Sequence, residues 1–146
     1  MTVEPATARL LAEILAEPAS AAARLVYADH LLEQGDPRGE LVQLQCQLEQ
    51  LPWDAPARRT LDERIADLLA VHETAWTRDV RVLGFREHLH QVSVRRGFVE
   101  KVTLGASDAG ELVPALRALT PLRELDVHVR VRDDGRDLDE LLALGA

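Results

Sequence analysis

Asp29 and His30 are the side chains in this sequence that most readily suggest acid–base chemistry. They are neighbours in a segment of helical periodicity, and consecutive helical residues point about 100° apart, so they cannot form a proton relay with each other. The sequence also lacks a Gly-x-Ser-x-Gly nucleophile turn. The competing interpretation is structural, with Arg24, Tyr27 and Asp29 forming a hydrogen-bonded set. We predict no catalytic residue and keep one alternative, an enzyme or a regulatory subunit of one with a pocket around Tyr27, Asp29 and His30.

Two further groups could bind a metal ion or an anion. His88 and His90 would share one face of a strand, but zinc needs three or four ligands and Cys46 offers no suitably spaced partner. Arg95-Arg96-Gly97 could hold a phosphate in a turn, yet two arginines are too few for a nucleic-acid footprint. We therefore predict no metal site, no cofactor and no nucleic-acid partner, and we interpret Cys46 as a buried, unreactive thiol.

Charge balance and cysteine content limit the partners and the compartment. The 146 residues include 17 Lys and Arg against 25 Asp and Glu, a net charge of −8 that disfavours binding to nucleic acid and to anionic membranes. The single cysteine cannot form an intrachain disulfide, and residues 1–17 lack the basic start and apolar run of a signal peptide. No window approaches the ~20 apolar residues of a membrane span. The expectation is a soluble cytoplasmic protein with no membrane partner.

Four amphipathic helices are predicted in the first half of the chain. Apolar residues recur at spacings of three and four in 6–17, in a second segment between Ser20 and Gly35, in 37–51, and in a fourth segment that fades near Arg81. Gly35 suits the left-handed conformation that ends a helix, and the Asp36-Pro37 pair that follows suits the start of the next. Such helices most simply form a small antiparallel bundle. Trp53 and Trp76 are expected to pack against it.

From His88 onward the apolar period changes to two, which indicates strands. We predict a β-hairpin with Arg95-Arg96-Gly97 as its turn, a short helix within 105–119, a strand over 122–129 and a terminal helix from about Leu138. Pro114 weakens the case for the short helix, because proline is tolerated only in a helix's first turn.

An internal repeat is visible in this second half. Residues 99–104 and 122–127 align with apolar residues at their first, fourth and sixth positions, and the two copies are 23 residues apart. Leucine-rich repeats have periods of roughly 20–29 residues, and the strands of successive units lie parallel.

The N-terminal helices carry a motif that resembles a known family. It consists of Arg24-Leu25-Val26-Tyr27-Ala28-Asp29 followed by Leu31, Glu33, Gly35-Asp36-Pro37, Glu40-Leu41 and Leu44-Gln45. This run is similar to the repeat-companion domain of myxobacterial and planctomycete proteins, and Arg96-Gly97-Phe98 with its following strands looks like the degenerate leucine-rich repeats that come after it. His30 departs from the family, which usually has Trp at that place. The resemblance implies an interaction module without enzymatic activity and with an unknown partner.

Together these patterns predict an α+β chain, with a helical module over residues 1–83 and a short leucine-rich-repeat-like module over residues 84–146. The fold is a four-helix module followed by a β-hairpin and about two strand–helix units. Two repeats are fewer than a solenoid normally needs, so the last strand should leave an edge that a protein partner or a second copy could extend. The predicted partner-binding residues are Leu125, Val127, Val129, Leu138, Leu141 and Leu142. In the alternative, the terminal helix folds over this edge as a cap and leaves a monomer.

Overall fold

The computed structural model describes residues 4–83, 89–106 and 109–128 of the chain. These residues form an α+β fold, as predicted, with helices α1 Pro5–Ala16, α2 Ala21–Glu33, α3 Pro37–Gln50, α4 Ala57–Trp76, α5 Arg78–Leu83 and α6 Ala109–Leu119. The strands are β1 Leu89–Arg95, β2 Phe98–Gly105 and β3 Glu124–His128. His88, the side chain of His90, Val129 and the predicted terminal helix with Leu138, Leu141 and Leu142 lie outside the described residues.

The α2–α3 connection confirms the signals read from the sequence. Gly35 has φ +74°, and it donates its N–H to the Leu32 carbonyl while Asp36 donates to the Leu31 carbonyl, so two free carbonyls at the end of α2 are satisfied. The Asp36 carboxylate then accepts the N–H of Arg38 at 2.9 Å, with Pro37 in the first turn of α3. This short, fully bonded connection fixes α2 and α3 as a helical hairpin.

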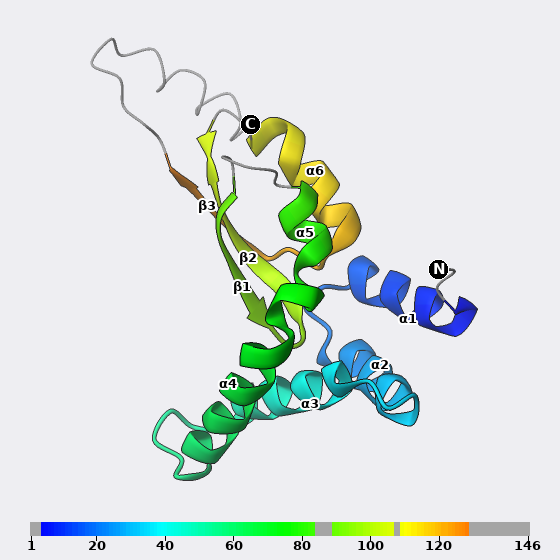
Figure 1. Cartoon of the computed structure of the whole chain (residues 1–146), viewed down its shortest axis with the longest axis vertical. Coiled ribbons are helices and arrows are strands. Elements are labelled where there is room, and N and C mark those ends of the chain that lie inside the picture. The colour runs from blue at the N-terminus through cyan, green and yellow to red at the C-terminus, as the bar shows by residue number, and fades with distance from the viewer. Residues whose placement is uncertain (1–3, 84–88, 107–108, 129–146) are drawn as a thin grey trace.

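The first four helices pack in chain order, α1 on α2, α2 on α3 and α3 on α4 (Figure 1). One core cluster joins α1, α2 and α3 to the tip of the β-hairpin, through Leu10, Ile14, Tyr27, Ala28, Leu31, Val42, Cys46 and Phe98. A separate cluster, centred on Leu41, Ile65 and Leu68, holds α4 against α3. The core of the helical layer therefore includes a residue of the sheet, so hydrophobic packing crosses the border predicted between residues 83 and 84.

The β-hairpin turns where the sequence predicted. Arg96 and Gly97 both have positive φ, +46° and +81°, which is the backbone geometry of a two-residue type I′ turn. Ser93 pairs with Lys101 but Val94 pairs with Val99, so Glu100 is an extra residue in β2, a β-bulge. The bulge shifts the alternation of side chains along β2, and Val99 then lies in the same apolar cluster as Val102 and Leu104.

Strand β3 extends the sheet in the order β1-β2-β3 and lies parallel to β2. Val102 pairs with Leu125 and Leu104 with Val127, which is the same 23-residue offset that aligned the two segments in the sequence. Helices α5 and α6 cover one face of this sheet, with Val80 and Leu116 in the cluster beneath it (Figure 1).

Three local expectations need correction. Trp53 does not pack against the helices, since it lies in the α3–α4 loop with 88% of its surface exposed, whereas Trp76 does pack, half-buried and stacked on His72. The fourth helix stops at Trp76 instead of running to Arg81, and Thr77 separates it from α5. Pro114 lies inside α6 beyond its first turn, where it has no N–H to donate to the preceding turn, and its side chain is exposed.

Candidate functional site

Three buried charged residues join the helices to the β-hairpin, and we call them the ionic clamp: Arg24, Arg96 and Glu100. Arg24 is completely buried, and Arg96 and Glu100 are 3% and 2% exposed. One oxygen of Glu100 lies 2.7 Å from Arg24 Nη2 and 2.8 Å from Arg96 Nη2. Arg24 Nε is buried and has no hydrogen-bond partner among the described residues. Other guanidinium donors reach main-chain carbonyls, with Arg24 donating to Pro18 at 2.7 Å and Arg96 to Ala19 at 3.0 Å. The clamp therefore ties α2, the α1–α2 loop and β2 together.

Burial dominates the electrostatics of the clamp. It lowers the pKa of Arg24 to about 10, an effect that the Glu100 charge opposes and the Arg96 charge reinforces. Two guanidinium groups share the one buried carboxylate, and Glu49, 3.7 Å from Arg96 and half-exposed, supplies further negative charge. A buried cation without such partners would be strongly unfavourable, so the clamp is stable only as a complete set.

Polar side chains of α3 also form hydrogen bonds with the backbone of the hairpin turn. Gln45 accepts the Gly97 N–H at 2.7 Å and donates to the Val94 carbonyl at 3.1 Å, while Arg38 donates to the Gly97 carbonyl at 2.9 Å. The Arg38 guanidinium also lies 4.7 Å from the centre of the Phe98 ring. The phosphate-binding role weighed for residues 95–97 finds no support here, because the turn's backbone and the Arg96 side chain already bond within the protein.

Tyr27, Asp29 and His30, which could line a pocket if the protein were an enzyme, each contact a different partner. Tyr27 is buried against Phe98, with ring centres 5.6 Å apart, and burial raises the pKa of its hydroxyl. Asp29 is exposed and accepts a hydrogen bond from Gln43 at 2.9 Å, and His30 bonds to Thr7 at 2.8 Å. The hydrogen-bonded set predicted for Arg24, Tyr27 and Asp29 is therefore wrong, because Arg24 turns instead toward Glu100.

Cys46 is buried in the first core cluster, as predicted. Burial raises the pKa of its thiol, although the positive charges of Arg96 and Arg24 oppose the shift. Across residues 4–83, 89–106 and 109–128, no three His, Cys, Asp or Glu side chains converge as metal ligands would. The helices of the same residues include none long and apolar enough to cross a membrane.

Strand β3 is an edge of the sheet within the described part of the chain, where it pairs only with β2. Of the predicted partner-binding residues, Leu125 is 38% exposed and Val127 is half-buried, and both lie level with apolar residues of β2. The other face of β3 carries Glu124 and Asp126, which pair with Lys101 of β2 at 3.6 and 2.8 Å, and Glu124 also pairs with Arg95 of β1. The edge thus offers an apolar row on one face and carboxylates on the other.

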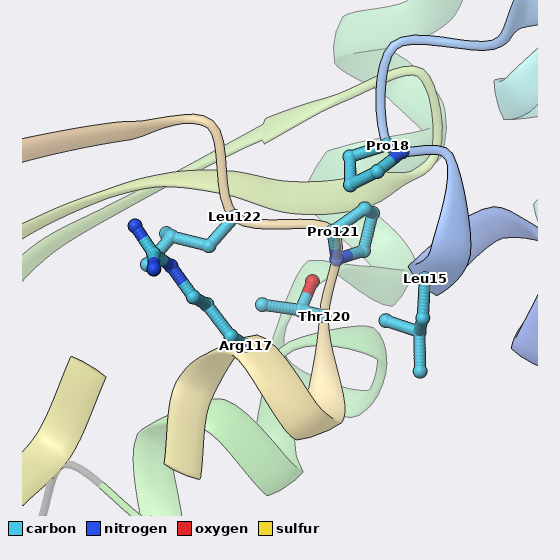
Figure 2. A pocket seen from close by; sticks show the side chains of 6 residues that line it. All are labelled: Leu15, Pro18, Arg117, Thr120, Pro121 and Leu122. Atoms are coloured by element: carbon cyan, nitrogen blue, oxygen red, sulfur yellow. The ribbon is translucent and has the colours of Figure 1, made fainter. Parts of the chain in front are cut away.

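A hollow of about 270 Å³ lies between the C-terminal ends of α1 and α6 (Figure 2). Figure 2 shows Leu15 and Pro18 on the α1 side, Arg117 and Leu122 on the α6 side, and Thr120 and Pro121 between them. The Thr120 hydroxyl is already used, since it donates to the Val99 carbonyl at 2.6 Å. The hollow is therefore lined by aliphatic side chains, the buried Thr120 and one exposed guanidinium, and its surface is at least as polar as it is apolar.

Sequence reasoning missed the ionic clamp and the hollow. The sequence held only a weak signal for the clamp, which is an acidic residue, Glu100, directly after the apolar pair Phe98-Val99 in a strand. No comparable signal existed for the hollow, because its lining comes from segments about a hundred residues apart, Leu15 and Pro18 against Arg117 and Leu122.

These contacts define an α+β protein in which a β-α-β unit, β2-α6-β3, is joined to a helical layer by buried charges. No protein-family model, no curated protein and no solved structure matches the chain. The resemblance to the repeat-companion domain and to leucine-rich repeats thus rests on the sequence motifs alone.

Proposed function

We propose that this protein is a non-catalytic protein-interaction module that binds a protein partner, or a second copy of itself, along the outer edge of β3. The observation that carries the proposal is the position of β3, a strand paired on one side only within the described residues. A strand with a free side presents backbone N–H and C=O groups that another strand can pair with.

The side chains of β3 indicate what an added strand would meet. Leu125 and Val127 would contact apolar side chains of the partner on one face of the extended sheet. On the other face, Glu124 and Asp126 are already paired with Arg95 and Lys101, so a partner strand with polar, uncharged residues on that face would fit. Val129, Leu138, Leu141 and Leu142 belong to the proposed surface as well, from sequence reasoning alone.

The proposal also includes the family resemblance and the division of the chain. We interpret residues 1–83 as a repeat-companion module and residues 84–146 as a short leucine-rich-repeat-like module in the cytoplasm. The parallel pairing of β2 and β3 across α6, at an offset of 23 residues, supports the repeat interpretation. Phe98 in the helical core supports modules that fold together. The competing arrangement is a terminal helix that folds over the β3 edge as a cap.

The test compares two lysine substitutions of valine. Val127→Lys places a charge in the apolar row of β3, and Val71→Lys, at an exposed position on α4, is the matched control. We expect Val127→Lys to remove the association that depends on the β3 edge, measured by light scattering and by pull-down from the native host, and Val71→Lys to leave that association intact. Circular dichroism verifies that both variants fold. A monomeric wild type without an edge-dependent partner, or a Val127→Lys variant that keeps every association, would show that the edge is not the interface.

A further inference from the structure

Trp53 projects from a loop whose conformation is held by hydrogen bonds that do not involve the indole. The indole is 88% exposed, while the turn beneath it is closed by the Ala55 N–H donating to the Pro52 carbonyl at 3.1 Å. Arg58 fixes the same loop to the end of α3, because one guanidinium nitrogen donates to the Leu48 and Leu51 carbonyls at 2.9 and 3.0 Å. The loop therefore keeps its shape without any contact from the indole. A large aromatic side chain held in water on a preorganised turn is typical of an anchor for another protein.

The hollow between α1 and α6 has the size and chemistry to receive such an anchor. Its volume of about 270 Å³ lies below the roughly 300–1,000 Å³ of pockets for whole small molecules, so it suits a single side chain. Leu15, Pro18 and Leu122 are half-buried and line it with aliphatic groups, while Thr120 and Pro121 are buried. Arg117 makes no ion pair or hydrogen bond within the part of the chain that the structure describes, so its guanidinium is free to stack on an aromatic ring.

Charge complementarity points to a second copy of this chain as the occupant. Asp54, the residue after Trp53, is exposed and has no ion-pair partner among the described residues. Arg117 at the hollow is likewise exposed and has no ion-pair partner among them. The loop lies at the end of the helical layer remote from the sheet, whereas the hollow lies beside α6, so the two are far apart in one chain (Figure 1).

We propose that Trp53 of one copy enters the hollow of a second copy, with the Asp54 carboxylate against the Arg117 guanidinium. The two contacting surfaces differ, so this is a head-to-tail contact that can continue from copy to copy. It uses neither face nor edge of β3, so it is a second interaction surface, independent of the proposed function.

Trp53 can report on its own burial. The chain has two tryptophans, and a Trp76→Phe variant leaves Trp53 as the only one. We expect its emission maximum to move to shorter wavelength as the chain concentration rises from about 1 μM to about 1 mM, the range that spans weak specific association. Adding Arg117→Glu should remove that shift, and adding Val127→Lys should not. Emission that stays at the solvent-exposed wavelength over the whole range would overturn the proposal. The Trp76→Phe protein is first checked for a native circular dichroism spectrum.

Mixing two variants that each lack one half of the contact tests the proposed contact in chains that retain Trp76. Trp53→Ala loses the anchor but keeps the hollow, whereas Arg117→Glu alters the hollow but keeps the anchor. Each variant alone therefore lacks one half of the contact, and sedimentation should show its self-association weakened at least about tenfold. Their mixture should form 1:1 dimers that do not grow further, and Asp54→Arg combined with Arg117→Glu should restore self-association. All three substituted positions are exposed, so loss of folding is not expected. A mixture that stays monomeric, or variants that associate like wild type, would refute the contact.

Discussion

Replacing Glu100 by glutamine tests whether the ionic clamp holds the helices to the β-hairpin. The substitution keeps the size and shape of the side chain and removes only its negative charge. Arg24 would keep its contacts with main-chain carbonyls but lose its buried counter-charge at 2.7 Å, and Arg96 would lose the same charge at 2.8 Å. Because Glu100 raises the pKa of Arg24 against the effect of burial, that pKa would fall further in the variant.

The expected loss of stability is large. Removing one member of a buried ion pair costs about 3–5 kcal/mol, and the lower half of that range is expected here because the glutamine oxygen can still accept a hydrogen bond. Arg24 is completely buried, so solvent cannot screen the charge that is left behind. A domain of this size has a free energy of unfolding of about 5–15 kcal/mol, so the variant would lose a substantial part of it.

Urea denaturation followed by circular dichroism measures this loss directly. The matched control is Glu63→Gln on α4, whose partner Arg59 lies at 3.0 Å but in solvent, and it should leave the unfolding midpoint unchanged. In a double-mutant cycle, Arg24→Met with Glu100→Gln should cost less than the sum of the two single changes, because the orphaned cation is absent. If Glu100→Gln unfolds at the same urea concentration as wild type, the clamp does not hold the hairpin.

Further predictions concern two glycines and one surface ion pair. Gly35→Val should cost about 1–2 kcal/mol from strain at φ +74° alone, because an added Cβ meets nothing within 4 Å. Gly97→Ala should cost more, about 2–4 kcal/mol in urea melts, since its Cβ would also lie 2.1 Å from a Val42 methyl group; equal costs would contradict the packing of the turn on α3. The hydrogen bond from Arg64 lowers the pKa of Glu40 in the folded state, so the stabilisation is complete above the ordinary glutamate pKa of about 4.3 and is lost as pH falls through the lower folded value. The difference in unfolding midpoint between wild type and Glu40→Gln should therefore be present at about pH 7 and absent at about pH 2, and a difference that does not change with pH would refute it.

The helix boundaries were largely predictable because their causes are local. Ser20, Gly35 and the Asp36-Pro37 pair act on backbone groups within a few residues of themselves, so the sequence alone contains the cause and the effect. The hairpin turn follows from the same logic, since Gly97 supplies a positive φ. The break at Thr77 after α4 was not predicted, because no proline or glycine marks it.

The interior was predictable in composition but not in its pairings. Apolar periodicity predicted the amphipathic segments, although not every leucine in them is buried, since Leu31 is 4% exposed and Leu32 41%. The 23-residue offset matched the register of β2 and β3. Periodicity could not show that Phe98 fills the core of the helical layer, because that contact depends on how the hairpin tip docks, tens of residues from its partners in sequence.

The sequence by itself determined most of the helix and strand boundaries, the apolar period of each element, and that no disulfide can form within the chain, since each of these depends on residue type and short-range spacing. Tertiary structure alone decided the roles of the charged and aromatic residues. Arg24 left its predicted partners for Glu100 because the β2 bulge brings that carboxylate within 2.7 Å, and Trp53 was left in solvent because Arg58 and the flanking prolines close its loop without it. Electrostatic and packing energies depend on distance in space, and distances between remote segments exist only once the chain has folded.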